Sequence, residues 1–307
     1  MLSIILAKKI FSLFLIMAMS WLLVKCKMLK ASDSRIVSVL LLYMFFPCVI
    51  LYSFQVDFTD QVKQGLLLGV FAAVVIHAMY LGICAFLGRV MGMTPVEKCS
   101  VIYSNSGNLM IPLVIAILGQ EWVIYTSSFM AVQLVLFWSH LKSEISGEAT
   151  MDWKAVVTNV NMLAIMVGLV LLFTGWRFPA PVNDALGSLG VIVGPSAMII
   201  AGLLLGEMDF RKLLSYKRMP LIALLRLIVV PLISLVVLKY SGMAKLAEQG
   251  DMVLLITLLA CATPSATTVV SMASLFSEEG EYASAINVVT AILCIFTMPL
   301  IVAVYQW

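Results

Sequence analysis

The sequence predicts an all-α polytopic membrane protein with ten transmembrane helices. Of its 307 residues, 63% are hydrophobic and only 11% are charged, and the mean hydropathy is +1.09. These values lie outside the range of soluble globular domains. The charged residues are also spaced so that long apolar windows lie between them. Most windows reach about 20 residues, the length that crosses roughly 30 Å of hydrocarbon as a helix.

Each window is interpreted as one helix. The nine clearest are residues 36–56, 64–88, 99–120, 122–141, 155–176, 185–206, 219–238, 252–277 and 282–307. A tenth segment precedes them at residues 3–25 and carries Lys8 and Lys9 near its start. A cleaved signal peptide also begins with positive charge, but no small-x-small cleavage site precedes Lys25, so we interpret this segment as the first helix.

The distribution of Lys and Arg predicts the orientation, because cytoplasmic loops carry an excess of these residues. More of them fall in the loops at residues 25–35, 89–98, 142–154 and 211–218 than in the loops on the opposite side. We therefore expect a multi-pass protein of the cell membrane with both termini outside the cytoplasm.

The most polar stretch, residues 139–154, divides the ten segments into five and five. Because five is odd, the second group must enter the membrane from the opposite side, which makes an inverted repeat. We expect the first repeat at residues 1–140, a cytoplasmic linker at 141–153 and the second repeat at 154–307.

Recurring residues support this division. Both groups carry a proline in their second and in their fourth segment, which matches Pro47 with Pro195 and Pro112 with Pro264. His77 also follows Pro47 at nearly the spacing at which Arg226 follows Pro195.

The fourth and ninth segments combine helix breakers with polar residues, in "SNSGNLMIPLV" and "CATPSATTVVSMAS". Proline removes a backbone donor and glycine loosens the backbone, so both helices are expected to be interrupted near mid-membrane. Each interruption creates an N-terminus whose N–H groups and dipole favour an anion. The amides of Asn105 and Asn108 suit a carboxylate or a cation. Alternatively, the prolines only kink continuous helices and the polar side chains bond back to the backbone.

Two titratable residues lie deep in predicted helices. A charge at the depth of Arg226 costs about 2.5–3.5 kcal/mol on insertion scales, so it should face protein, carbonyl groups or water. Arg226 either ties helix ends together or attracts an anionic substrate. His77 is interpreted as a packed neutral histidine, with proton coupling as the alternative. No segment contains Asp or Glu at membrane depth, which disfavours coupling through carboxylates.

Several longer motifs match a known pattern. They are "NSGNLMIPLVIAILGQEWVIY", "RLIVVPL", "ATPSATTVVSMASLFSEEGEYASAINVVTAILCIFTMPL" and, around Pro47, "YMFFPCVIL". With these motifs the chain resembles, along essentially its whole length, the auxin efflux carrier family. That family includes bacterial dicarboxylate permeases and the plant PIN-formed carriers.

The resemblance implies two inverted five-helix repeats. Helices 1, 2, 6 and 7 would form a scaffold, and helices 3–5 and 8–10 a transport domain. Helices 4 and 9 would be broken and would cross at their prolines. The implied substrate-binding residues are Asn105, Asn108, Pro112, Thr263, Pro264 and Ser265, with Pro47 and Pro195 on the scaffold side. Met110 stands where many family members have glycine.

We therefore expect a secondary transporter of small organic anions, either mono- or dicarboxylates or auxin-like acids, that works by elevator-type alternating access. The alternatives are a sodium-coupled organic-anion symporter of the bile-acid type and a channel or sensor. An enzyme is not expected, because the sequence lacks HExxH, a GxSx nucleophile with a suitable His, and an intramembrane aspartate pair.

The expected partners are a small carboxylate substrate and the lipid bilayer, and a second copy of the chain, in a homodimer, is a further possible partner. Nucleic acid is not expected, because the net charge of +3 is small and there are no basic runs with aromatic residues between them. The six cysteines show no CxxC and no paired His spacing, so no metal site is predicted. No cofactor is expected, and the coupling ion, H⁺ or Na⁺, is left open.

Overall fold

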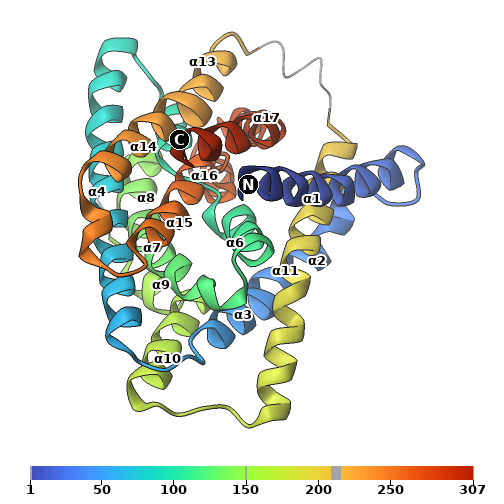
Figure 1. The fold of residues 1–307 in the computed structure, drawn as a ribbon. Coiled ribbons are helices and arrows are strands. Elements are labelled where there is room, and N and C mark those ends of the chain that lie inside the picture. The colour runs from blue at the N-terminus through green and yellow to red at the C-terminus, as the bar shows by residue number, and fades with distance from the viewer. Residues whose placement is uncertain (1, 149–150, 209–215, 307) are drawn as a thin grey trace. The chain divides into compact units, whose positions relative to one another are not determined.

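The computed structural model of the chain is built from helices and describes residues 2–148, 151–208 and 216–306 (Figure 1). The α-helices are α1 (Leu2–Lys25), α2 (Ser34–Leu40), α3 (Phe46–Ser53), α4 (Asp60–Met91), α5 (Pro95–Ile102), α6 (Ile111–Ile117), α7 (Val123–Leu136), α8 (Lys142–Ser146), α9 (Trp153–Val157), α10 (Val160–Thr174), α11 (Ala180–Gly206), α13 (Met219–Leu224), α14 (Val230–Tyr240), α15 (Gly250–Ala262), α16 (Thr267–Phe276) and α17 (Gly280–Gln306). Short 3₁₀ or π turns join several of them, at η1 (Ala31–Asp33), η2 (Leu41–Phe45), η3 (Ser106–Met110), η4 (Gln120–Trp122), η5 (Phe137–Leu141), η6 (Leu225–Val229) and η7 (Met243–Leu246).

Six continuous helices of the described residues are long and apolar enough to cross a membrane. They are Ala31–Ser53, Asp60–Met91, Gln120–Ser146, Ala180–Gly206, Met219–Tyr240 and Gly280–Tyr305. Shorter apolar helices occupy the other predicted windows, at Phe11–Lys25, Ser106–Ile117, Val160–Thr174, Gly250–Ala262 and Thr267–Phe276. The prediction of an all-helical, multi-pass membrane protein is therefore confirmed.

Local sequence explains where α10 begins and ends. The side chain of Asn159 accepts hydrogen bonds from the backbone N–H groups of Asn161 at 3.0 Å and of Met162 at 3.3 Å, which caps the start of the helix. At the other end, Gly175 adopts a left-handed conformation with φ of +68°, which glycine takes without a Cβ penalty.

The helices form two compact units, which are described separately. Unit 1 comprises residues 1–63, 107–127 and 158–209, and unit 2 comprises residues 64–106, 128–157 and 210–307. Unit 1 thus holds most of the first, second, sixth and seventh predicted segments, with the second half of the fourth and the start of the fifth. Unit 2 holds the rest.

In unit 1, α1 packs closely on α11 (Figure 1). The contact is close because α11 presents glycine there. A Cβ on Gly202 would strike the carbonyl oxygen of Met17 and lie 2.7 Å from the Cβ of Ser20. A Cβ on Gly206 would strike Val24. Small residues of this kind let membrane helices approach to backbone contact.

We expect Gly202→Ala to weaken the packing of α1 on α11. The added methyl group has no space, and overpacking of this kind costs about 1–3 kcal/mol. The variant should unfold at a lower temperature and give less monodisperse protein in size-exclusion chromatography. Gly82→Ala in α4 is the matched control, because a Cβ there meets nothing within 4 Å. Equal melting temperatures for the two variants would contradict the close contact.

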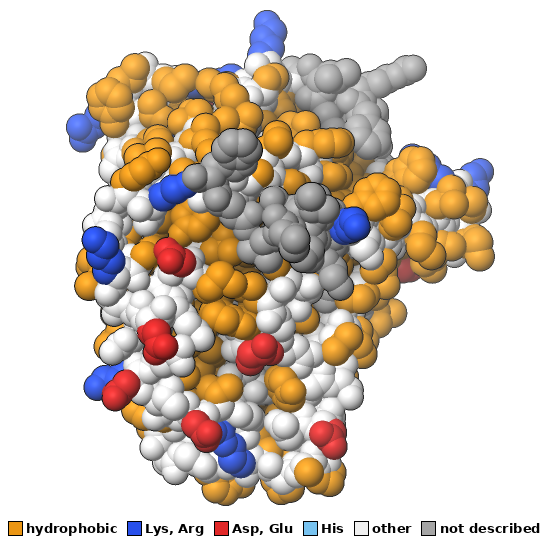
Figure 2. Space-filling view, in the orientation of Figure 1, with side chains coloured by type: hydrophobic (Ala, Val, Ile, Leu, Met, Phe, Trp, Pro, Cys, Tyr) orange, Lys and Arg blue, Asp and Glu red, His pale blue; other side chains and the backbone are white. Residues whose placement is uncertain are grey.

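The outer face of unit 1 is apolar where α1 and α2 lie. Figure 2 shows hydrophobic side chains over this part of the surface. Met19, Leu22 and Ile36 are among the exposed large side chains, with 67%, 54% and 71% of their surface accessible. Such exposure suits contact with lipid acyl chains and would be costly in water.

Candidate functional site

The chain leaves the helical conformation inside the fourth and the ninth predicted segments, as the sequence predicted, and both breaks lie in unit 2. The first break, Tyr103–Asn105, follows α5, and the second break, Thr263–Ala266, follows α15. The two extended segments lie antiparallel, with Ser104 opposite Ser265. Buried backbone groups of a membrane protein that lose their helical partners must be satisfied within the protein, and the pairing does so.

Two backbone hydrogen bonds hold this pairing. The N–H of Asn105 donates to the carbonyl oxygen of Pro264 at 2.9 Å, and the N–H of Ala266 donates to that of Tyr103 at 3.0 Å. We call the paired segments, Tyr103–Asn105 and Thr263–Ala266, the crossing.

The crossing is not at both prolines, as the resemblance had implied. Pro264 does lie in an extended segment, but Pro112 lies in the first turn of α6, which continues from η3 without interruption. Pro112 is thus the seventh residue of the continuous helix Ser106–Ile117, and its missing N–H leaves one helical hydrogen bond unmade without ending the helix. On the fourth segment the crossing residue is Ser104 instead. The match between Pro112 and Pro264 therefore does not mark equivalent backbone positions.

Arg226 in η6 is fully buried, and its guanidinium group binds the ends of two helices. At the end of α5, Nη1 donates to the carbonyls of Val101 at 3.0 Å and Ile102 at 3.5 Å. At the end of α15, Nη2 donates to Cys261 at 3.2 Å and Thr263 at 2.8 Å, and Nε donates to Thr263 at 3.1 Å. Because a guanidinium group has five N–H donors, these bonds use its full capacity. Of the two alternatives for Arg226, the geometry favours the tie between helix ends.

Arg226 also balances charge at the crossing. Each helix C-terminus carries about half a negative charge, so the ends of α5 and α15 together offset the guanidinium cation. The helices that start after the breaks begin at Ser106 and Thr267, and neither has an acidic residue in its first turn. Their N-termini therefore keep the partial positive charge of a helix start.

Gln133 in α7 braces the first break, and the sequence interpretation missed it. Its Oε1 accepts hydrogen bonds from the N–H of Ser104 at 3.3 Å and from the Ser104 hydroxyl at 2.8 Å. Its Nε2 donates to the carbonyl of Ser104 and to Oγ of Ser106, both at 2.9 Å. The available signal was a lone amide in the apolar run "AVQLVLF".

Two residues of α17 brace the second break. Nδ2 of Asn287 donates to the carbonyl of Ser265 at 2.6 Å, and the N–H of Ser265 donates to Oγ1 of Thr290 at 3.2 Å. The Ser265 hydroxyl is buried and meets no hydrogen-bond partner among the described residues. A buried hydroxyl of this kind is suited to bind a ligand at the crossing.

His77 in α4 is packed in the interior of unit 2. Its Nδ1 lies 2.7 Å from the carbonyl of Ala73, and its ring lies 4.7 Å from the ring of Phe129 between centroids. Its Nε2 is buried and makes no hydrogen bond of good geometry to the described residues. The surroundings favour the packed neutral histidine over proton coupling, which stays a prediction.

The remaining predicted site residues lie in unit 1. A Cβ on Gly194 would lie 3.4 Å from the Cβ of Pro112, so α6 packs on α11 beside Pro195. A Cβ on Gly107, next to Asn108, would lie 3.8 Å from the ring of Phe46, the neighbour of Pro47. The structure thus brings the second half of the fourth segment to the sequence neighbours of Pro47 and Pro195, whose scaffold role stays a prediction. Met110 of that segment is fully buried.

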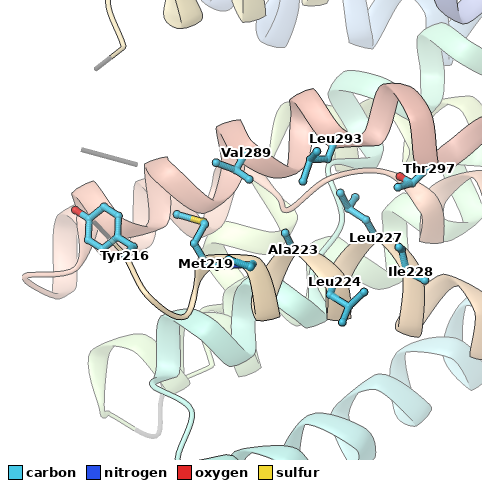
Figure 3. Close-up of a pocket in the computed structure, with 10 residues that line it drawn as sticks. Tyr216, Met219, Ala223, Leu224, Leu227, Ile228, Val289, Leu293 and Thr297 are labelled. Atoms are coloured by element: carbon cyan, nitrogen blue, oxygen red, sulfur yellow. The ribbon is translucent and has the colours of Figure 1, made fainter. Parts of the chain in front are cut away.

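A cavity of about 420 Å³ lies between α13, η6 and α17 (Figure 3). It is lined mainly by apolar side chains of these helices, including Met219, Ala223, Leu227 and Leu293. None of the predicted site residues lines it. Its lining holds no Asn or Gln side chain, in contrast to the crossing, so it is not the candidate substrate site.

These features define a class of protein. A polytopic helical membrane protein with two broken helices that pair at their breaks has the organisation of membrane carriers. A family model described as "Membrane transport protein" matches residues 5–151 and 148–302, nearly the whole chain. The chain belongs to this family, the auxin efflux carrier family of membrane transport proteins, and it is not an enzyme. No curated protein matches the chain.

Proposed function

We propose that the chain is a secondary transporter of small organic anions, with mono- or dicarboxylates as its substrates. The observation that carries this proposal is that the negative helix ends at the crossing have a charged partner and the positive helix ends have none in their first turns. Arg226 occupies the negative ends of α5 and α15, whereas the positive ends at Ser106 and Thr267 carry no acidic residue. The local field therefore favours an anion.

A carboxylate at the crossing would meet uncharged donors. Asn105 is half-buried and directly follows the Ser104 pairing, and the Ser265 hydroxyl is available on the other segment. Thr263 and Pro264 supply the backbone of that segment, whereas Asn108 belongs to unit 1 and stays a prediction of the family resemblance. Uncharged donors hold an anion without trapping it, because release then breaks no strong ion pair.

For transport we propose ten helices in two inverted repeats and elevator-type alternating access. The positions of His77 and Arg226 support the repeat, since both lie in the third helix of their group and inside unit 2. Contacts between loops support the expectation that successive helices run in opposite directions. In unit 1, for example, Arg177 before α11 binds Asp57 after α3 at 2.7 Å. The Lys and Arg distribution supports termini outside the cytoplasm.

Uptake by the purified protein in liposomes tests this proposal. We expect saturable uptake of at least one radiolabelled carboxylate from a panel of mono- and dicarboxylates. Asn105→Ala should raise the KM by about 10- to 100-fold, because a hydrogen bond to a charged group contributes about 1.5–3 kcal/mol. Asn183→Ala, at the start of α11, is the matched control and should leave the KM unchanged. Equal KM values for Asn105→Ala and wild type would remove Asn105 from the site.

The same liposomes separate the proposal from its alternatives. Counterflow, in which internal unlabelled substrate accelerates uptake, is expected of a carrier and not of a channel. Uptake that requires a sodium gradient would instead favour a symporter of the bile-acid type.

A further inference from the structure

One long helix of unit 2 carries contacts to both ends of α5. That helix runs through α13, η6 and α14, and Arg218 lies just before it while Arg226 lies within it. The two arginines are eight residues apart (226 − 218), and α5 is eight residues long. Both spans are roughly 12 Å at 1.5 Å per residue. The matched lengths let Arg226 bind the C-terminus of α5 while Arg218 reaches its N-terminus.

Glu97 is the residue that Arg218 meets at the start of α5. Only 1% of Glu97 is exposed, and Nη1 of Arg218 lies 3.3 Å from its Oε2. The N–H of Thr94 donates to the same oxygen at 3.0 Å, and the hydroxyl of Tyr282 donates to Oε1 at 3.0 Å. Each oxygen of the Glu97 carboxylate therefore accepts at least one hydrogen bond, and the Arg218 cation lies beside one of them.

The same cluster connects four helix ends. Arg218 also donates to the carbonyls of Met91 and Gly92, at the end of α4. The hydroxyl of Thr94 donates to Glu279, in the turn before α17, at 2.9 Å. The end of α4 and the starts of α5, α13 and α17 are therefore gathered around one buried carboxylate. Neither the charge pattern nor the family resemblance had singled out Glu97.

We propose that Glu97 and Arg218 are positioning residues for the crossing. With Arg226 at the other end, they fix α5 along its axis, and α5 leads directly into Tyr103–Asn105. The register of Ser104 on Ser265 therefore depends on a carboxylate in the first turn of α5, at the end of that helix remote from the crossing. A slip by one residue would turn the Ser104 side chain away from Gln133, because successive side chains of an extended segment point to opposite sides. The consequence for transport rests on the proposed function, but the structural role does not.

Amide hydrogen exchange tests this role without transport. The reporters are the N–H groups of Asn105 and Ala266, which bond across the crossing. We expect Glu97→Ala to accelerate exchange at both by at least tenfold in the full-length protein. Glu97→Gln should have a smaller effect, since its single amide oxygen still accepts from the N–H of Thr94 and its NH₂ group can donate to the Tyr282 hydroxyl, while the ion pair with Arg218 is lost. Asp251→Ala is the matched control, because Asp251 is an exposed acid in the first turn of α15, which also ends at the crossing.

Transport kinetics provide the second measurement. We expect Glu97→Gln to raise the KM for the transported carboxylate several-fold while the maximal rate per folded protein changes less. A merely structural role would reduce the folded amount and leave the KM unchanged. If Glu97→Ala does not fold, amide exchange at Asn105 and Ala266 is measured in Glu97→Gln and Tyr282→Phe instead. Unchanged exchange at both amides in Glu97→Gln and Tyr282→Phe would overturn the proposal. If the wild type transports no carboxylate, the proposed function fails while the exchange result still decides the role of Glu97.

Discussion

Arg226→Ala is expected to prevent the protein from reaching a stable fold. Truncation leaves four carbonyl groups at the ends of α5 and α15 without their common donor, and it removes the cation that offsets both helix dipoles. Breaking a buried charged network by removing one partner costs about 3–5 kcal/mol. We therefore expect a large fall in melting temperature and in the monodisperse fraction in detergent.

Arg226→Lys makes this test specific for the guanidinium fork. An ammonium group keeps the charge but has three donors on one atom, so it cannot reach both helix ends in the same way. We expect an intermediate melting temperature for this variant. Arg89→Ala, which removes an exposed arginine in the last turn of α4, should melt like the wild type. If Arg226→Ala also melts like the wild type, the two helix ends do not depend on Arg226.

Gln133→Glu is expected to abolish transport although it changes a single atom. The wild-type Nε2 donates to the carbonyl of Ser104 and to Oγ of Ser106, and a carboxylate oxygen in its place would face that carbonyl without a proton. An unsatisfied buried polar group costs about 1–3 kcal/mol, and more for a charged one. The Ser104 segment should therefore move away from Ser265, and carboxylate uptake should fall to the background of empty liposomes.

Gln64→Glu is the control for this substitution, because Gln64 is an exposed amide of α4. It should transport like the wild type. Gln133→Leu should also lose uptake, since it leaves the Ser104 N–H and carbonyl without their side-chain partner. Wild-type uptake by both Gln133 variants would show that the brace on Ser104 is not needed for transport.

The sequence predicted an all-helical membrane protein with long apolar helices, because insertion into hydrocarbon demands apolar windows that can be read from charge spacing alone. It also predicted both helix breaks, since Gly, Pro and clustered polar side chains are costly in a continuous membrane helix. It could not place the crossing within those segments. Pro112 was the obvious marker, yet the extended backbone lies at Tyr103–Asn105, where Gln133 supplies the missing hydrogen bonds.

Contacts between distant segments could not be predicted from the sequence, for a physical reason. Gln133 lies in α7 and Glu97 lies in the first turn of α5, so neither is part of a break. The periodicity of a sequence does not show which side chain of another helix faces a break. Arg226 was recognised as buried, but only its distances to the carbonyls of α5 and α15 separate a tie between helix ends from a substrate ligand. The site is therefore defined by pairs of residues that are far apart in the chain.

The central claim is that the crossing selects anions because Arg226 occupies only the negative helix ends. The most direct measurement is competition between a transported carboxylate and its own primary amide, which has nearly the same size and shape but no charge. We expect the unlabelled carboxylate to inhibit uptake of the labelled one at concentrations near its KM, and the amide to require at least tenfold more, a difference of about 1.4 kcal/mol. Equal inhibition by the amide and the carboxylate would contradict the claim.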